Sequence, residues 1–228
     1  MLLMQEFSIC RIERKKAFTG FILLLIIAMQ PAMGQHLELL TGGNKSSLRG
    51  LCALNDKVIW VCGSMGKVGR STDGGVHWDW MQPAGFETRD FRDIEAFDAN
   101  TAVILAVGEP AVILRTTDAG QHWEAVYTDP SKGVFMDAMD FADDQHGIVA
   151  GDPLPGSGGR LYLLTTSDQG KHWTRMDTDK AGLPLLKDGE AMFASSGTNI
   201  KYHKAGKNTA AGNFSIITGG TAASLIQS

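Results

Sequence analysis

The amino-acid sequence predicts an all-β fold built from repeated four-stranded antiparallel units. The first observation is a motif, Ser/Thr-x-Asp-x-Gly-x-His-Trp, that occurs at residues 71–78, 116–123 and 166–173. Its copies lie 45 and 50 residues apart, a period typical of propellers and other repeat architectures. The second observation is that short runs of β-branched and apolar residues, bounded by turn residues, fill the intervals without helical periodicity. Four strands in about 45 residues match one blade of a β-propeller, so a propeller is the predicted architecture.

About four such units follow one another, near residues 48–82, 91–129, 134–178 and 190–228. In each complete unit we expect four strands, lettered A to D from the centre of the propeller outward, with the motif in the turn between strands C and D. The third unit is longer, and its glycine-rich stretch 156–160 is interpreted as a loop insertion because it lacks the ending of a P-loop. The fourth unit is weaker: residues 189–200 resemble a strand A, and residues 213–228 resemble strands B and C.

Residues 1–34 are predicted to be a secretory signal peptide. Four basic residues precede the apolar run 17–29, and Ala32 and Gly34 form a small-residue cleavage site before Gln35. The run is short for a membrane-spanning helix, which needs roughly 20 residues, and an uncleaved anchor is the alternative. We therefore expect an exported protein, periplasmic, on the cell surface or secreted, with no membrane insertion after cleavage.

Two alternatives exist for the completeness of the propeller. Residues 35–41 resemble residues 121–128, with one residue fewer and a leucine in place of tryptophan, and could be the outer strand that closes the ring. The chain would then be a closed four-bladed ring. The alternative is the front part of a six- or seven-bladed propeller that is truncated. The truncated longer propeller is favoured because the fourth unit is irregular and because Ser228 aligns with Thr116, the first residue of an earlier copy of the motif.

Charge and cysteine content limit the partners and the redox chemistry. Residues 1–34 hold four of the 21 basic and two of the 25 acidic side chains, so the remainder carries a net charge of −6. This balance argues against binding to nucleic acid, which needs clustered Lys and Arg. Cys10 lies in the signal region, whereas Cys52 and Cys62 flank a predicted hairpin turn. An exported protein could join them in a disulfide, but two free buried thiols are equally compatible with the sequence.

The motif residues each have a structural reason to be present. An aspartate in a tight turn accepts bonds from backbone N–H groups, and the Ser or Thr hydroxyl does likewise. The glycine allows a positive φ, and the tryptophan can pack between neighbouring blades. We therefore expect structural, not catalytic, roles for the whole set: Ser71, Asp73, Gly75, Trp78, Thr116, Asp118, Gly120, Trp123, Thr166, Asp168, Gly170 and Trp173.

No metal site is predicted. His77, His122 and His172 hold the same place in successive units, so they are separated radially and cannot converge on one ion. The other histidines, His36, His146 and His203, show no local ligand spacing.

The motif at 71–78, 116–123 and 166–173 is identified as the Asp-box, or bacterial neuraminidase repeat. It occurs in sialidases, in sortilin-type receptors and in a bacterial group related to the photosystem II assembly and stability factor. The chain after residue 34, with its short regular units and strands such as FRDIEAFD (91–98), most resembles that last group. The resemblance implies that each Asp-box is a structural turn, placed away from the active face. It implies a chlorophyll-protein partner only if the source is photosynthetic.

Sialidase activity is disfavoured by the residues present. That family uses an arginine triad, a Tyr–Glu nucleophile pair and an acid/base Asp, with the first arginine in a Phe/Tyr-Arg-Ile/Leu-Pro motif. Here FRDI (91–94) lacks the proline, follows the first Asp-box and corresponds to residues 48–51 of the first unit. The three tyrosines, Tyr127, Tyr162 and Tyr202, have no such motif around them.

A binding site is expected on the face opposite the Asp-boxes. If strand A lines the channel, the D-to-A connectors and B-to-C turns share that face, which we call the mouth face. The residues predicted there are Arg49, Arg92, Asp93, Glu109, Asp137, Asp152 and Glu190. They could bind a cation, a sugar or a basic peptide, or they could only stabilise strand ends.

The predicted function is therefore an exported binding or assembly scaffold without a cofactor, with a protein or carbohydrate ligand at the channel mouth. A sialidase-like glycoside hydrolase with its site in the same place is the alternative. It would need two carboxylates at a suitable separation.

Overall fold

The computed structural model describes residues 37–42, 45–192, 197–204 and 213–228. The predicted signal peptide at 1–34 lies outside these residues. The chain divides into two units, Met1–Leu39 and Leu40–Ser228, and every strand belongs to the second. Among the described residues, no helix has the length and apolar character needed to cross a membrane.

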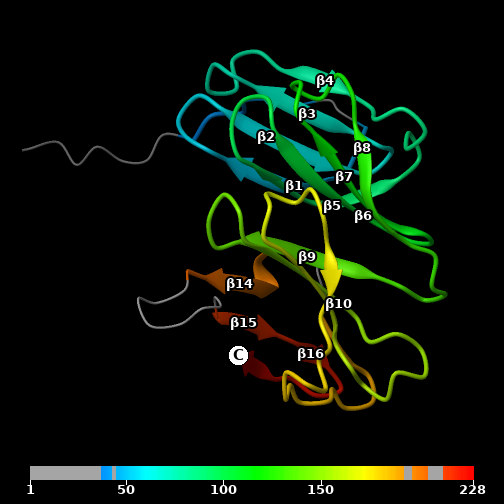
Figure 1. Ribbon diagram of the computed structural model, residues 1–228. Helices are drawn as coiled ribbons and strands as arrows, with labels where there is room; N and C mark the ends of the chain where they lie inside the picture. The colour runs from blue at the N-terminus through cyan, green and yellow to red at the C-terminus, as the bar shows by residue number, and fades with distance from the viewer. Residues whose placement is uncertain (1–36, 43–44, 193–196, 205–212) are drawn as a thin grey trace, which may run out of the picture. The chain divides into compact units, whose positions relative to one another are not determined.

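Three complete sheets of four antiparallel strands follow one another along the chain (Figure 1). In each sheet the strands pair in sequence order, so every connection is a simple hairpin. We call these sheets the first, second and third blades. The first contains β1 (Leu48–Ala53), β2 (Ile59–Gly63), β3 (Val68–Ser71) and β4 (Asp79–Met81). The second contains β5 (Asp90–Ala96), β6 (Ala102–Val107), β7 (Ala111–Thr116) and β8 (Glu124–Asp129). The third contains β9 (Met136–Phe141), β10 (Gly147–Gly151), β11 (Tyr162–Thr166) and β12 (Thr174–Arg175).

The inner strands of the three blades share a β-bulge at the same place. The pairing of β1 with β2 skips Arg49, and that of β5 with β6 skips Arg92. The pairing of β9 with β10 skips Asp137 in the same way. A bulge of this kind re-aims one side chain at a strand end. Arg92 therefore occupies a repeat position equivalent to Arg49, as the comparison of FRDI with residues 48–51 predicted.

The fourth unit departs from the predicted pattern. Its inner strand was expected over residues 189–200, but it is divided into β13 (Glu190–Ala191) and β14 (Ile200–His203), which extends past the predicted end. A short 3₁₀ turn, Gly197–Asn199, precedes β14, and Gly and Asn are poor strand formers. β15 (Asn213–Ile217) pairs with β14 and with β17 (Leu225–Gln227), while β16 (Gly219–Gly220) pairs with β13. β13 and β14 together thus act as strand A, β15 and β16 as strand B, and β17 as strand C.

The apolar core lies in layers between successive sheets. One cluster joins residues of the first and second blades, another joins the second and third, and another joins the third blade to the fourth unit. Asp-box tryptophans belong to the first two layers. Trp123 meets Trp60 of β2 edge-on at 6.4 Å between ring centroids, and Trp173 meets Phe141 at 5.9 Å. Trp60 belongs to the blade before that of Trp123, so this pair joins two blades. Phe141 belongs to the same blade as Trp173, and Trp173 lies in one apolar cluster with Val103 and Leu105 of the second blade.

Residues 37–42 carry no strand. Even so, Leu40 occupies the place that an outer strand of a preceding blade would fill. A Cβ on Gly75 would lie 2.6 Å from Leu40 Cδ1, just as one on Gly120 would lie 2.1 Å from Met81 Sδ. Leu40 thus contacts the first Asp-box as Met81 of β4 contacts the second. Ring closure by residues 35–41 remains a prediction.

Candidate functional site: the mouth face and inner strands

In each Asp-box, the motif residues form hydrogen bonds with one another in the turn before the outer strand. In the second copy, Asp118 Oδ1 accepts bonds from His122 N at 2.9 Å and from the Thr116 hydroxyl at 2.9 Å. Gly120 N donates to Thr116 Oγ1 at 3.0 Å, and Trp123 Nε1 donates to Gly120 O at 3.1 Å. The same bonds recur at 71–78 and 166–173. The motif side chains are therefore engaged in holding the turn.

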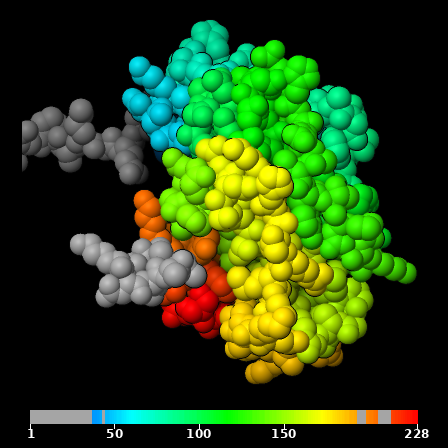
Figure 2. Space-filling model, viewed as in Figure 1, coloured from blue at the N-terminus to red at the C-terminus, as the bar shows by residue number. Residues whose placement is uncertain are grey.

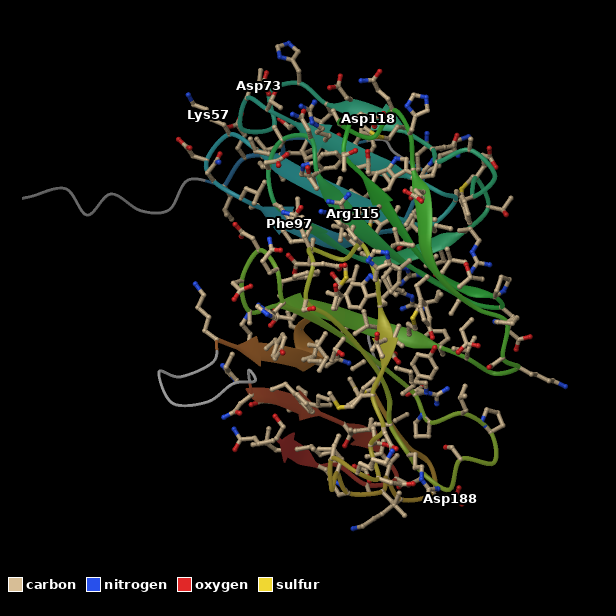
Figure 3. All side chains as sticks on the ribbon, in the orientation of Figure 1. Lys57, Asp73, Phe97, Arg115, Asp118 and Asp188 are labelled. Atoms are coloured by element: carbon tan, nitrogen blue, oxygen red, sulfur yellow. The ribbon has the colours of Figure 1, made fainter. Side chains whose placement is uncertain are left out.

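The three motif histidines extend from these turns into solvent. His77 Nδ1 lies 2.6 Å from Asp73 Oδ2, and the other two copies repeat this distance. The His77 backbone amide and imidazole lower the pKa of Asp73 to about 2. Figure 3 shows Asp73 and Asp118 at separate turns, with Lys57 near Asp73. The backbone carbonyl of Lys57 accepts a hydrogen bond from Gly74 N at 2.9 Å. No cluster of three or more metal-ligating side chains occurs among the described residues.

The opposite ends of the blades form the mouth face. Here the connectors between blades contact the turns between second and third strands: Gly66 N donates to Arg89 O at 2.7 Å. The Arg89 guanidinium in turn donates to the carbonyls of Gly108 and Pro110. D-to-A connectors and B-to-C turns therefore share one face, as the sequence predicted.

The predicted acids of this face are spread over different connections, and each accepts a backbone bond. Glu109 Oε1 accepts from Gly133 N at 2.6 Å, which joins the second blade to the start of the third. Asp152 Oδ1 accepts from Met192 N at 2.8 Å, which joins the third blade to the fourth unit. Glu190 accepts from Lys187 N at 3.0 Å and from the Thr218 hydroxyl. These carboxylates connect neighbouring segments.

A second set of acids lies along the inner strands. Asp93 is buried, and its two oxygens accept bonds from Ile94 N at 2.9 Å and Met139 N at 2.8 Å. Burial raises the pKa of Asp93 to about 7. Burial, followed by the charge of Asp93, raises the pKa of Glu95 to about 8. Asp140 accepts bonds from Lys201 Nζ at 2.7 Å and from the backbone amide of Tyr202.

Glu95, Asp140 and Lys201 were not among the site residues predicted from the sequence. The available signal was the alternation of acids with apolar residues in FRDIEAFD and FMDAMDFADD. Asp137, which was predicted at the mouth, is 2% exposed at its bulge.

A basic and aromatic cluster lies at the start of the inner strands. Arg49 Nε is 3.0 Å from Asp90 Oδ1, and Arg92 Nε is 3.6 Å from Asp90 Oδ2. The Arg92 guanidinium also lies over the Phe135 ring, 5.5 Å from its centroid. We call these four residues the two-arginine cluster. Both guanidinium groups reach the carboxylate of Asp90, and guanidinium groups pair well with carboxylates.

Cys52 and Cys62, the cysteines within the described residues, are free thiols. In the β1–β2 ladder Cys62 is opposite Gly50, and Cys52 is opposite Trp60, so the two are not directly paired. Burial raises the pKa of Cys52 to about 12 and raises that of Cys62 well above its ordinary value. Of the two alternatives that the sequence left open, the structure has the free thiols.

Residues 50–133 match the family model described as Photosynthesis system II assembly factor YCF48. A solved structure of YCF48 from Cyanidioschyzon merolae aligns at 16% identity and a TM-score of 0.51, covering 82% of this chain and 58% of that one. The chain therefore has the fold of a β-propeller with Asp-box turns, and its residues 50–133 are similar to this assembly-factor family. The predicted fold class is thereby confirmed.

Other solved structures align with this Asp-box propeller at lower scores. YCF48 bound to D1 peptide aligns at 18% identity and a TM-score of 0.45, covering 79% of this chain and 64% of that one. The NanB sialidase from Streptococcus pneumoniae aligns at 13% identity and a TM-score of 0.43, covering 74% of this chain and 26% of that one. No curated protein matches the chain. The propeller thus spans about three fifths of the YCF48 chains that it matches.

Proposed function

We propose that this propeller is an exported binding scaffold whose ligand is a polypeptide, held at the mouth face by the two-arginine cluster. The observation that carries the proposal is that Arg49 and Arg92, from adjacent blades, both approach the carboxylate of Asp90. Their side chains are 29% and 19% exposed, so ligand atoms can reach both. The predicted signal peptide at 1–34 favours a role outside the cytoplasm.

A polypeptide ligand suits the chemistry of this cluster. A peptide carboxylate could pair with the guanidinium groups, and an apolar or aromatic side chain could pack beside Phe135. The neighbouring acids Glu109 and Asp152 already accept backbone bonds, which favours a binding surface over a hydrolytic one. The relationship to an assembly factor and the YCF48 complex with D1 peptide suggest a protein partner of this kind.

An array of peptides with free carboxyl termini, including the D1 peptide, tests the proposal. We expect selective binding, weakened about tenfold by Arg49→Ala or Arg92→Ala, the loss of one charge-assisted contact. Arg160→Ala is the matched control, because Arg160 pairs with Asp179 away from the cluster, at 2.7 Å. Failure of the wild-type protein to bind any peptide, or binding by both cluster variants as tight as that of the wild type, would count against the proposal.

One observation favours the glycoside hydrolase alternative. Glu95 is a half-buried carboxyl whose pKa of about 8 keeps it protonated at neutral pH. A general acid needs this property. The hydrolase alternative therefore predicts that Glu95 donates the proton to a leaving group, and a turnover assay decides between the two.

A further inference from the structure

A groove of about 460 Å³ lies between the second and third blades, on the side of the molecule that carries the Asp-boxes. One wall is the start of β8, and the other is the third Asp-box. Figure 2 shows the yellow surface of the third Asp-box segment beside the green surface of the second blade. Both walls belong to complete four-stranded blades. The lining residues are Arg115, Glu124, Ala125, Val126, Lys171 and His172.

Arg115 of the second blade is held in place by the third Asp-box. Its Nε donates to Gln169 O at 3.1 Å, and its Nη2 donates to Gln169 Oε1 at 3.0 Å. These two bonds join neighbouring blades and fix one edge of the guanidinium group. Within the described residues no acceptor is bonded to Nη1, so the donors of this nitrogen are left for a ligand.

The first blade shows a different arrangement for the equivalent arginine. Arg70 immediately precedes the first Asp-box, as Arg115 precedes the second. Arg70 Nη1 pairs at 3.2 Å with Asp79, its partner in the β3–β4 ladder. Arg115 has the same ladder relationship to Glu124, but its guanidinium group is turned to the next blade. In the part of the chain that the structure describes, no carboxylate forms an ion pair with Arg115.

The two side chains that distinguish the third Asp-box from the other copies are Gln169 and Lys171. They occupy variable positions of the motif, where the first copy has glycine and valine and the second has alanine and glutamine. Gln169 has a φ of +63°, a left-handed conformation that glycine adopts more readily. The turn therefore requires neither side chain, and both serve the groove: Gln169 holds Arg115, and Lys171 lines it.

The groove thus brings together two cations from different blades. Lys171 is exposed, and like Arg115 it has no ion pair among the described residues. Guanidinium and ammonium groups form strong charge-assisted hydrogen bonds with carboxylates. Glu124 is the one acid of the lining, and it is exposed. The chemistry of the lining therefore favours a ligand that brings a carboxylate to Arg115 and Lys171.

The wall formed by β8 favours an extended polypeptide as the carrier of that carboxylate. β8 is the outermost strand of its sheet and pairs with β7 on one side. The free edge of an outer strand can form backbone hydrogen bonds with an added strand. Ala125 and Val126 of β8 add an apolar surface beside the charged residues. Since successive side chains of an extended strand point to opposite faces, acids at alternate positions would all lie on one face.

We propose that this groove is a second docking site, which binds an acidic extended segment of a partner protein. A carboxylate of the segment pairs with Arg115 and Lys171, and the backbone of the segment runs along β8. The like charge of Glu124 weakens the binding. The site lies on the Asp-box side and is separate from the mouth face, so it does not depend on the ligand of the two-arginine cluster.

Isothermal titration calorimetry of the full chain with a short peptide tests the proposal. The peptide alternates glutamate with threonine and valine, and its ends are acetylated and amidated. We expect saturable binding that weakens as the salt concentration rises, because the contacts are between partly exposed charges. The same peptide with glutamine in place of glutamate should bind at least about tenfold more weakly, through the loss of charge-assisted contacts.

Variants of the protein identify the site. Lys171→Gln should weaken the binding of the acidic peptide about tenfold, and Glu124→Gln should strengthen it about threefold by removing a like charge. Lys57→Gln is the matched control and should leave the binding unchanged. Lys57 is an exposed lysine beside the first Asp-box, and Figure 3 shows it away from Arg115. Thermal unfolding confirms that the variants fold.

Three results would overturn the proposal. The first is absence of binding by the wild-type protein, or equal binding of the glutamate and glutamine peptides. The second is binding by Lys171→Gln as tight as that of the wild type. The third is binding that Arg49→Ala abolishes and Lys171→Gln retains, which would assign the peptide to the mouth face.

Discussion

Asp93 Oδ2 in β5 accepts a hydrogen bond from the backbone amide of Met139 in β9 at 2.8 Å. A carboxylate of the second blade thus accepts a backbone hydrogen bond from the inner strand of the third blade. Glu109 with Gly133, and Asp152 with Met192, repeat the relationship at the mouth face. Acids at these junctions act chiefly on the stacking of one blade against the next.

The stability of the protein should fall as pH rises from about 4 to about 8. The folded-state pKa values of Asp93, about 7, and Glu95, about 8, lie above those of the unfolded chain. The folded state therefore binds more protons than the unfolded state in this window, and its stabilisation is lost on passing through the folded pKa values. Urea unfolding at pH 5 and pH 8 measures the difference. Glu95→Gln should flatten the slope and the exposed Glu124→Gln should not; stability that rises with pH would contradict the account.

Thr116→Val should destabilise the second Asp-box. The Thr116 hydroxyl is buried and accepts the bond from Gly120 N, which valine cannot accept although its shape is the same. Loss of a buried acceptor costs about 1–3 kcal/mol of unfolding free energy. Chemical denaturation measures it, with Thr128→Val on the exposed side of β8 as the control. Equal stability of the two variants would show that the hydroxyl does not hold the turn.

Gly120→Ala should be more destabilising than Gly85→Ala. Both glycines have φ of +83°, so the backbone strain of alanine is matched at roughly 1–2 kcal/mol. A Cβ at Gly120 would also lie 2.1 Å from Met81 Sδ, whereas one at Gly85 has no atom within 4 Å. Moving Met81 within the blade junction adds an overpacking cost of about 1 kcal/mol or more. Differential scanning calorimetry should give the lower Tm for Gly120→Ala, and identical Tm values would argue against tight packing there.

Cys52 and Cys62 should resist thiol reagents until the protein unfolds. Their pKa values are raised by burial, so the reactive thiolate is scarce at pH 8. In a Cys10→Ser background, Ellman's reagent should report no fast reaction in buffer and two thiols in denaturant. A reductant should leave the Tm unchanged. Fewer than two thiols in denaturant without reductant would indicate a disulfide.

The repeat predicted the sheets well because the Asp-box carries its own interactions. Thr116, Asp118 and Gly120 bond to one another within five residues, so a local sequence pattern reports a local turn. The acids along the inner strands were harder to find because their contacts are distant in sequence. Asp140 meets Lys201 across 61 residues, a proximity set by the stacking of two sheets. The division of the fourth inner strand was missed for a related reason: its register comes from pairing with β15 and β16.

The central claim is that the acids of the mouth face and of the inner strands hold the propeller together and do not catalyse. A hydrolysis assay tests this claim most directly. The measurement is release of 4-methylumbelliferone from sialoside and glucoside substrates by the wild-type protein and by Glu95→Gln, Glu109→Gln and Asp152→Asn. We expect no turnover above the blank, and lower unfolding free energies for the Glu109 and Asp152 variants, which lose bonds between neighbouring segments. Turnover by the wild-type protein that is abolished in a variant that still folds would contradict the account.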